Sequence, residues 1–175
     1  MQLRVTSDAS YLGDPLSRSR WAGHYQLGDF PNDKPNGPIL VATSLINNIC
    51  TSACEAEMSA AFHNSCNIKH MRITLENLGH VQQVVVMIMD NEAAVNVFND
   101  FAHLKHTHAL NMRFFFVKEL VSMGSLDIKW ASGASNLADA FTKLLPVKEY
   151  SARRHLYVQD DFVKSSTHSA EGVLV

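Results

Sequence analysis

The spacing of apolar and polar residues changes several times along the chain, and each change predicts a different element. Residues 2–6 alternate between polar and apolar side chains, which predicts a first strand ending close to Asp8. Residues 23–27 and 38–43 are short apolar segments separated by many turn-forming residues, a pattern typical of an antiparallel hairpin with a long loop. The first part of the chain is therefore expected to supply three strands.

Helical spacing begins in the middle of the chain. Ser52 and Glu55 form a capping-box pattern, and apolar residues then recur at largely helical spacing up to Gly79. These features predict the longest helix. Residues 84–89 form a continuous β-prone apolar run, which predicts a central strand covered on both faces and ended by Asp90.

The rest of the chain returns to alternating helix and strand signals. We expect helices over residues 92–101 and 110–123, a strand over 126–131, and a last helix over 136–145 that Pro146 stops. This order of elements predicts an α/β fold, in which a mixed sheet carries helices on its faces.

The composition is that of one globular domain followed by a tail. The chain has 175 residues, of which 46% are hydrophobic, enough for a single core. Beyond Pro146 the sequence is polar and without clear period. We therefore expect a domain over residues 1–146 and a tail over 147–175, partly helical at first and flexible later.

Charge, cysteine content and hydropathy limit the function classes. The net charge of −2 gives no global attraction to nucleic acid, so such a partner must be bound locally. Three cysteines without CxxC spacing argue against a disulfide framework and a closed zinc site. No signal-peptide core or membrane-spanning run is present in the sequence. We expect an intracellular location (cytoplasm, virus-like particle or nucleus), without secretion or a membrane partner.

Four acidic residues stand where strands and helices are expected to meet. Asp8 and Asp90 follow predicted strands, Glu57 borders the apolar stripe of the long helix, and Asp139 lies in the first turn of the last helix. Converging carboxylates suit hard divalent cations such as Mg²⁺. Each residue also has a structural explanation: Asp8 an Asx turn, Asp90 a strand end, Glu57 a solvent-facing position, and Asp139 helix-dipole stabilisation after an Asn136 N-cap.

The residues around these acids resemble a known family. In order and spacing, four segments are similar to the ribonuclease H domain at the end of copia-type retrotransposon polyproteins: SDASYLGD at 7–14, SACEAEMSA at 52–60, MDNEAAV at 89–95 and NLADAFTKLLP at 136–146. The resemblance implies a five-stranded ribonuclease H-like sheet, with three antiparallel strands followed by two parallel ones and helices on both faces. The order of elements agrees with it independently.

The resemblance also implies a function. A ribonuclease H (an RNA–DNA hybrid ribonuclease) hydrolyses the RNA strand of RNA/DNA hybrids with two Mg²⁺ or Mn²⁺ ions, which Asp8, Glu57, Asp90 and Asp139 would hold as metal-binding and catalytic residues. A reverse transcriptase portion of the same polyprotein is then a further expected partner. The substrate-binding residues expected by the same resemblance are Ser10, Asn91, Lys105, His106, His108 and Arg113.

The segment 105–113 departs from the family's basic pattern. His106 and His108 replace basic residues, and Asn111 stands where Asp is usual. These departures motivate an alternative to the ribonuclease H function, a non-catalytic nucleic-acid or protein-binding module on the same fold. A nuclease of the wider superfamily acting on DNA is a third hypothesis, against which the ADAFTK match argues. A zinc site at His103, His106 and His108 is disfavoured, because the spacing is not a standard one.

Overall fold

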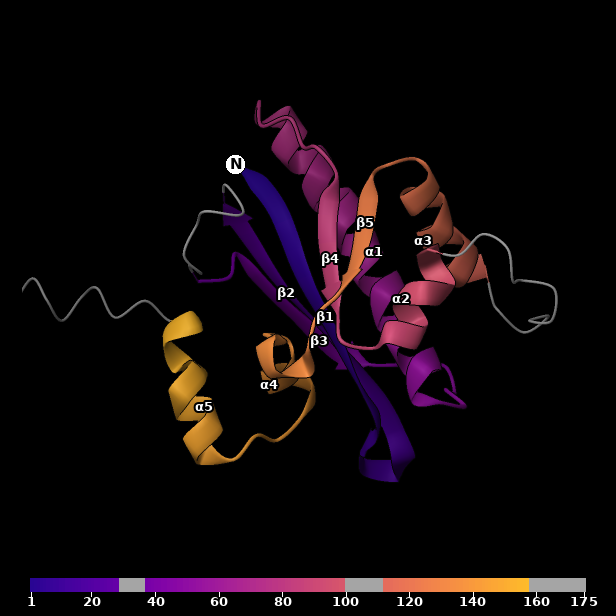
Figure 1. Ribbon diagram of the computed structural model, residues 1–175, viewed down its shortest axis with the longest axis vertical. Coiled ribbons are helices and arrows are strands. Elements are labelled where there is room, and N and C mark those ends of the chain that lie inside the picture. Colours follow the sequence, from indigo (N-terminus) through magenta and orange to yellow (C-terminus); the bar gives the residue numbers. More distant parts are fainter. Residues whose placement is uncertain (29–36, 100–111, 158–175) are drawn as a thin grey trace, which may run out of the picture.

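A five-stranded mixed sheet forms the centre of the molecule. The computed structural model describes residues 1–28, 37–99 and 112–157. Its strands are β1 (Gln2–Asp14), β2 (Arg18–Gly28), β3 (Leu40–Leu45), β4 (Val85–Met89) and β5 (Leu126–Trp130). They lie in the order β3-β2-β1-β4-β5. β1, β2 and β3 pair antiparallel, and β4 and β5 run parallel to β1 (Figure 1). This topology confirms the fold expected from the sequence.

The first strand is longer than its sequence pattern predicted. β1 does not end before Asp8 but continues to Asp14, and Asp8 pairs with Ala22 in the middle of the ladder to β2. Polar residues usually mark the end of a strand. Here the backbone ladder continues through them, and α1 (Ala53–Asn77) together with the C-terminal region supplies partners for their side chains.

Most helices form where the hydrophobic period predicted them. α1 begins with Ser52 as N-cap, whose hydroxyl accepts a hydrogen bond from the backbone N–H of Glu55. α2 (Glu92–Asn99) and α3 (Met112–Ser122) follow on either side of residues that the structure does not describe. No helix among the described residues has the length and apolar character needed to cross a membrane.

The prediction of a last helix over residues 136–145 is largely wrong. Residues 136–145 contain only the single turn α4 (Asp139–Thr142), preceded by the 3-10 turn η3 (Gly133–Ser135). Asn136 has an extended backbone and does not cap the helix from the expected position; instead its side chain accepts from the N–H of Ala138 and donates to β1. Tertiary hydrogen bonds therefore decide this segment's conformation.

The two faces of the sheet are covered differently. Alternate residues of β2 point to opposite faces. Tyr25 contacts α1 on the face that carries the main apolar core, whereas His24 packs against Phe141 of α4 on the other. Figure 1 shows α4 and α5 (Val147–Arg153) on the side of the sheet away from α1. β4 is fully buried only at alternate positions, so the expected cover on both of its faces is partial.

A buried polar network fixes α1 to the sheet beside the acidic residues. Asn64 donates to the Ser7 hydroxyl (2.9 Å) and to the carbonyl of Ala22 (3.0 Å), and accepts from the hydroxyl of Tyr25 (2.6 Å). Asn64, Ser7 and Tyr25 are fully buried. Because unpaired polar groups are costly inside a core, this network determines the register of α1 over β1 and so the position of Glu57.

Candidate metal centre

Strand register brings the first two acidic residues together. β1 and β4 are paired up to Thr6 and Ile88. Asp8 and Asp90 each lie two residues beyond that pair, which places them on the same side of adjacent parallel strands. Beyond the paired part of β1 and β4, the N–H of Ala9 donates to Oε1 of Glu57 (3.1 Å). This hydrogen bond holds Glu57 beside Asp8, the residue before Ala9.

Asp8, Glu57 and Asp90 form a compact group of carboxylates. One oxygen of each lies within 4.8 Å of the others. Asp8 is fully buried, Glu57 is 5% exposed, and Asp90 is half-buried. Oε2 of Glu57 is buried and has no hydrogen-bond partner among the described residues. An anionic oxygen in such a place lacks the compensation that buried polar atoms normally have.

The electrostatics of the group reflect this crowding. Burial raises the pKa of Asp8 to about 6, partly offset by a hydrogen bond from Thr142 and by the charge of Lys143. Burial, reinforced by the charges of Asp8 and Asp90, raises the pKa of Glu57 well above its ordinary value. Three acids held together in this way would be stabilised by a cation.

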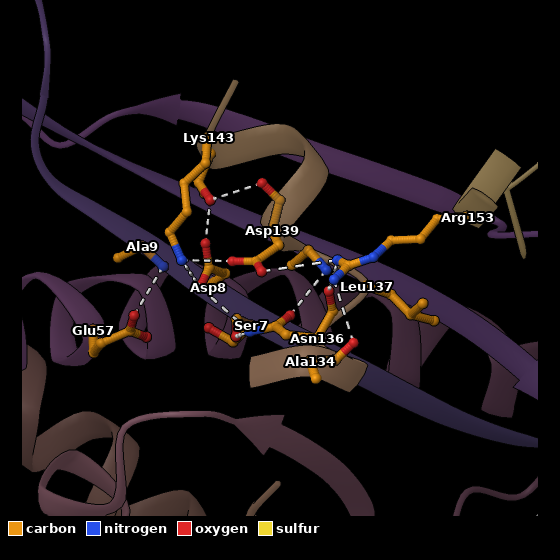
Figure 2. Close-up of polar contacts among 12 residues, drawn as sticks. Ser7, Asp8, Ala9, Glu57, Ala134, Asn136, Leu137, Asp139, Lys143 and Arg153 are labelled. Atoms are coloured by element: carbon orange, nitrogen blue, oxygen red, sulfur yellow. Dashed lines mark hydrogen bonds and ion pairs between the residues drawn. The ribbon is translucent and has the colours of Figure 1, made fainter. Parts of the chain in front are cut away.

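The fourth acid lies beside this group and is paired with side-chain cations. Asp139 does not belong to the cluster of three. Its Oδ1 accepts from Nζ of Lys143 at 2.5 Å, and its Oδ2 lies 3.8 Å from Arg153. Nζ of Lys143 is also 3.4 Å from Oδ1 of Asp8, so it bridges the two carboxylates (Figure 2). The expected convergence is thus direct for three acids and mediated by Lys143 for the fourth.

Asp8 receives further contacts from the C-terminal part of the fold. The hydroxyl of Thr142 donates to Oδ2 of Asp8, and Nδ2 of Asn136 lies 3.3 Å from Oδ1. We expected Asn136 only as a helix cap and gave no role to Thr142 or Lys143. Their signal was nevertheless present, because Thr142 and Lys143 belong to the ADAFTK motif and Lys143 lies four residues after Asp139, where helical side chains meet.

The expected substrate-binding residues have varied surroundings. Ser10 is buried on β1, and its hydroxyl has no partner among the described residues. Asn91 accepts from the N–H of Ala94 and so caps α2. Arg113 donates to Asn48 (2.5 Å) and lies over the ring of Phe62. The remaining positions fall outside the described residues, as does the disfavoured zinc site: Lys105, His106 and His108, with His103.

The group of three fits a hard divalent cation. It offers only oxygen ligands, and one of them, Oε2 of Glu57, is buried without a partner in the described part of the chain. Mg²⁺ and Mn²⁺ accept a few carboxylates and complete their shells with water or phosphate oxygens.

Comparison with solved structures defines the class of fold. The N-terminal RNase H domain of a Mycobacterium tuberculosis protein has a TM-score of 0.56 at 15% identity, covering 81% of this chain and 90% of that one. LC11-RNase H1, solved with an RNA/DNA hybrid, has a TM-score of 0.57 at 16% identity, covering 79% and 91%. RNase H1 from Halobacterium salinarum has a TM-score of 0.53. The protein has the ribonuclease H fold.

Comparison of sequences adds to the fold a group of related proteins. No family model matches the chain. The Pol polyprotein of transposon TNT 1-94 from Nicotiana tabacum is 25% identical over 154 residues, which are 88% of this chain and 11% of that protein. The Ty1-LR2 Gag-Pol polyprotein of Saccharomyces cerevisiae is 24% identical over 155 residues, 85% of this chain and 8% of that protein. The homologues are thus Pol polyproteins of Ty1/copia-type transposons, which confirms the resemblance found in the motifs.

Proposed function

We propose that this chain is a metal-dependent endonuclease that hydrolyses the RNA strand of RNA/DNA hybrids. The observation that carries the proposal is the convergence of Asp8, Glu57 and Asp90 around the unpartnered Oε2 of Glu57. The fold and the transposon relatives support ribonuclease H-type chemistry. The chain matches about a tenth of the length of the TNT 1-94 polyprotein, and a reverse transcriptase portion of such a polyprotein is a proposed partner.

In this proposal the carboxylates are the protein's contribution to two bound Mg²⁺ or Mn²⁺ ions. Such ions activate the attacking water and stabilise the leaving oxygen when a phosphodiester is cut. Asp8, Glu57 and Asp90 would hold them, with Asp139 as the fourth carboxylate. The hydrogen bond from Ala9 fixes Glu57, and the side chain of Asn136 fixes Asp8. These contacts keep the acids oriented without help from the substrate.

A cleavage assay tests the proposal. The protein is incubated with labelled RNA/DNA hybrid, duplex DNA and duplex RNA, each with Mg²⁺, with Mn²⁺ and with chelator. We expect metal-dependent cutting of the RNA strand of the hybrid alone. Asp8→Asn should reduce the rate by at least about a hundredfold. Asp127→Asn is the matched control, because Asp127 is partly exposed and pairs with Lys129 away from the cluster.

The other outcomes separate the alternatives. Equal cleavage by Asp8→Asn, or no cleavage of the hybrid with either metal, would overturn the nuclease proposal. Retained binding of the hybrid without any cleavage would favour the non-catalytic module, which the altered segment at 105–113 motivates. Metal-dependent cutting of duplex DNA in preference to the hybrid would instead favour the DNA-directed nuclease.

A further inference from the structure

Lys143 holds a position between the acids that no other cation of the described residues shares. Its Nζ is 2.5 Å from Asp139 and 3.4 Å from Asp8, and both of these hydrogen bonds go to carboxylates. The side chain is 44% exposed, while Asp8 is fully buried and Asp139 is 14% exposed. The ammonium group thus lies between the carboxylates of Asp8 and Asp139, while the side chain stays partly exposed (Figure 2).

Arg153, the second cation near Asp139, is held in a different way. Its guanidinium donates to the backbone carbonyls of Asn136 and Ala134, at 3.4 and 3.3 Å, and lies 3.8 Å from Asp139. It is therefore fixed to the backbone, and its contact with Asp139 is the longer one. Lys143 has a flexible stem, and within the described part of the chain its ammonium group donates to the carboxylates of Asp8 and Asp139. Of the two, Lys143 is the one that can leave without breaking the fold.

We propose that Lys143 is a built-in counter-cation of the metal-free site. It neutralises Asp8 and Asp139 when no divalent ion is bound, and it gives up both contacts when Mg²⁺ or Mn²⁺ binds. The inference rests on the metal site proposed above, and it adds that Lys143 regulates the affinity of this site for metal. An ammonium group and a divalent ion cannot share the same carboxylate oxygens at low cost, because like charges repel strongly at such distances. Lys143 thus weakens metal binding and, in exchange, stabilises the empty site.

Lys143 of the ADAFTK motif therefore has two opposite effects, since it stabilises the metal-free site and lowers its affinity for metal. Without Lys143, Asp8 would lose its ion pair and Asp139 would keep only the 3.8 Å contact with Arg153, which destabilises the metal-free fold. With Lys143, an incoming ion must displace an ion pair before Asp139 can act as a ligand. Lys143 is therefore a positioning residue in this proposal, acting on metal affinity through the two carboxylates.

The test compares Mn²⁺ binding and thermal stability of the full chain and Lys143→Met, a variant of similar length without charge. Isothermal titration with MnCl₂ should give a Kd for Lys143→Met roughly tenfold lower than for the parent protein. In chelator, the same variant should have a Tm lower by several degrees, on the order of 4 °C. Saturating Mn²⁺ should remove that deficit, because the metal then supplies the missing positive charge.

Three further variants make the result specific. Lys143→Arg keeps the charge and should bind Mn²⁺ about as the parent does. Lys148→Met removes the same charge from an exposed position on α5 and should leave both Kd and Tm unchanged. Should Lys143→Met fail to fold, Lys143→Gln, which keeps a polar end group, carries the same comparison.

The outcomes distinguish this proposal from the one on which it rests. If the parent protein binds Mn²⁺ and Lys143→Met binds it equally or more weakly, the counter-cation role is overturned while the metal site stands. If neither the parent nor any variant binds Mn²⁺, the proposed metal site itself is overturned. If Lys148→Met also binds Mn²⁺ more tightly than the parent protein, the effect comes from the net charge of the protein alone, and the role of Lys143 is overturned.

Discussion

Gly23 of β2 and Asn64 of α1 approach each other so closely that a Cβ on Gly23 would lie 2.0 Å from Oδ1 of Asn64. The same Cβ would lie 2.7 Å from the ring of Tyr25, whose hydroxyl donates to Asn64. Only a residue without a side chain permits this contact. The buried network that positions α1, and with it Glu57, therefore depends on a glycine in the neighbouring strand.

Gly23→Ala is accordingly expected to lower the free energy of unfolding by about 3 kcal/mol or more, through overpacking and disrupted buried hydrogen bonds. Urea denaturation measures the change. Gly37→Ala is the matched control, since its Cβ would meet only an ordinary contact at 3.5 Å. Combining Gly23→Ala with Asn64→Ala should cost less than the sum of the two single changes, because they share one contact. Additive costs would contradict this account.

Glu57→Gln should make the metal-free protein more stable. Oε2 of Glu57 is buried without a partner in the described structure, and Asp8 and Asp90 add like charge. The amide of Gln can still accept from Ala9 through oxygen, and its nitrogen can donate to a neighbouring carboxylate. We expect a gain of about 1 kcal/mol in chelator, measured by urea denaturation.

If the proposed metal site is right, Mn²⁺ should stabilise the parent protein and not Glu57→Gln, because one of the proposed carboxylate ligands has been removed. Glu119→Gln, at an exposed position of α3, is the control. It should change neither the stability in chelator nor the stabilisation by Mn²⁺. Lower stability of Glu57→Gln in chelator would show that the carboxylate of Glu57 is not under the electrostatic stress inferred here. Such a trade between stability and function is common where charges are gathered for catalysis.

How far the site could be predicted depended on whether its geometry follows from local pattern. Asp8 and Asp90 could be expected at one edge of the sheet, because each follows a predicted strand, while the register that puts them side by side comes from the structure. Glu57 followed from the period of α1, whose start was clear from its capping box. The hydrophobic period placed these three acids at strand ends and on the border of α1, but it left a structural explanation open for each, and only the resemblance of the surrounding motifs singled them out.

The contacts that the C-terminal part of the fold makes with Asp8 could not be predicted in the same way. Asn136 lies 128 residues from Asp8 in sequence, and its side chain is used for that contact rather than as the expected N-cap. The preference of Asn for helix starts is weak compared with a buried tertiary hydrogen bond. β1 also extended past its expected end, because its polar residues find partners on α1 and α4. The division of the chain at residue 146 stays a prediction.

Stability should fall on acidification through His24. This residue is fully buried between Phe141 and Tyr157, and both ring nitrogens lack partners among the described residues. Burial lowers the pKa of His24 from 6.5 to about 4. Between these values the unfolded chain binds a proton that the folded protein does not, so stability is lost as the pH falls from about 6.5 to 4. The full contribution is roughly 3 kcal/mol.

The contribution is isolated by comparing the parent with His24→Phe, since Asp8 and other groups titrate in both. The difference in unfolding free energy between the two proteins, measured in urea at pH 7 and pH 4, should change by most of that amount in favour of the variant. Tyr157 is the ionisable side chain whose ring contacts His24, and it stays neutral in this range because burial raises its pKa. His80→Gln, at an exposed position, should show no such change.

Tyr157 links the C-terminal segment to residues 136–139, which include Asn136 and the start of α4 at Asp139. Its hydroxyl donates to the carbonyl of Leu137 (3.0 Å). Tyr157→Phe removes this hydrogen bond without altering charge or the ring packing on His24. We expect a loss of about 1 kcal/mol in stability and weaker Mn²⁺ binding by roughly threefold, because Asn136 and Asp139 are then held less firmly. Hydrogen exchange at the N–H of Ala138, which is bonded to Asn136, should become faster.

Tyr150→Phe is the matched control for this change, since it removes the hydroxyl of a half-exposed tyrosine on α5. It should leave Mn²⁺ affinity and the exchange of Ala138 as they are in the parent protein. Unchanged exchange at Ala138 in Tyr157→Phe would mean that residues 136–139 are held by Arg153 and Asn136 alone, and the C-terminal tyrosine would have no part in positioning the acids. Faster exchange with unchanged Mn²⁺ affinity would instead place Asp139 outside the metal site, because looser packing of this segment disturbs that carboxylate before those of Asp8, Glu57 and Asp90.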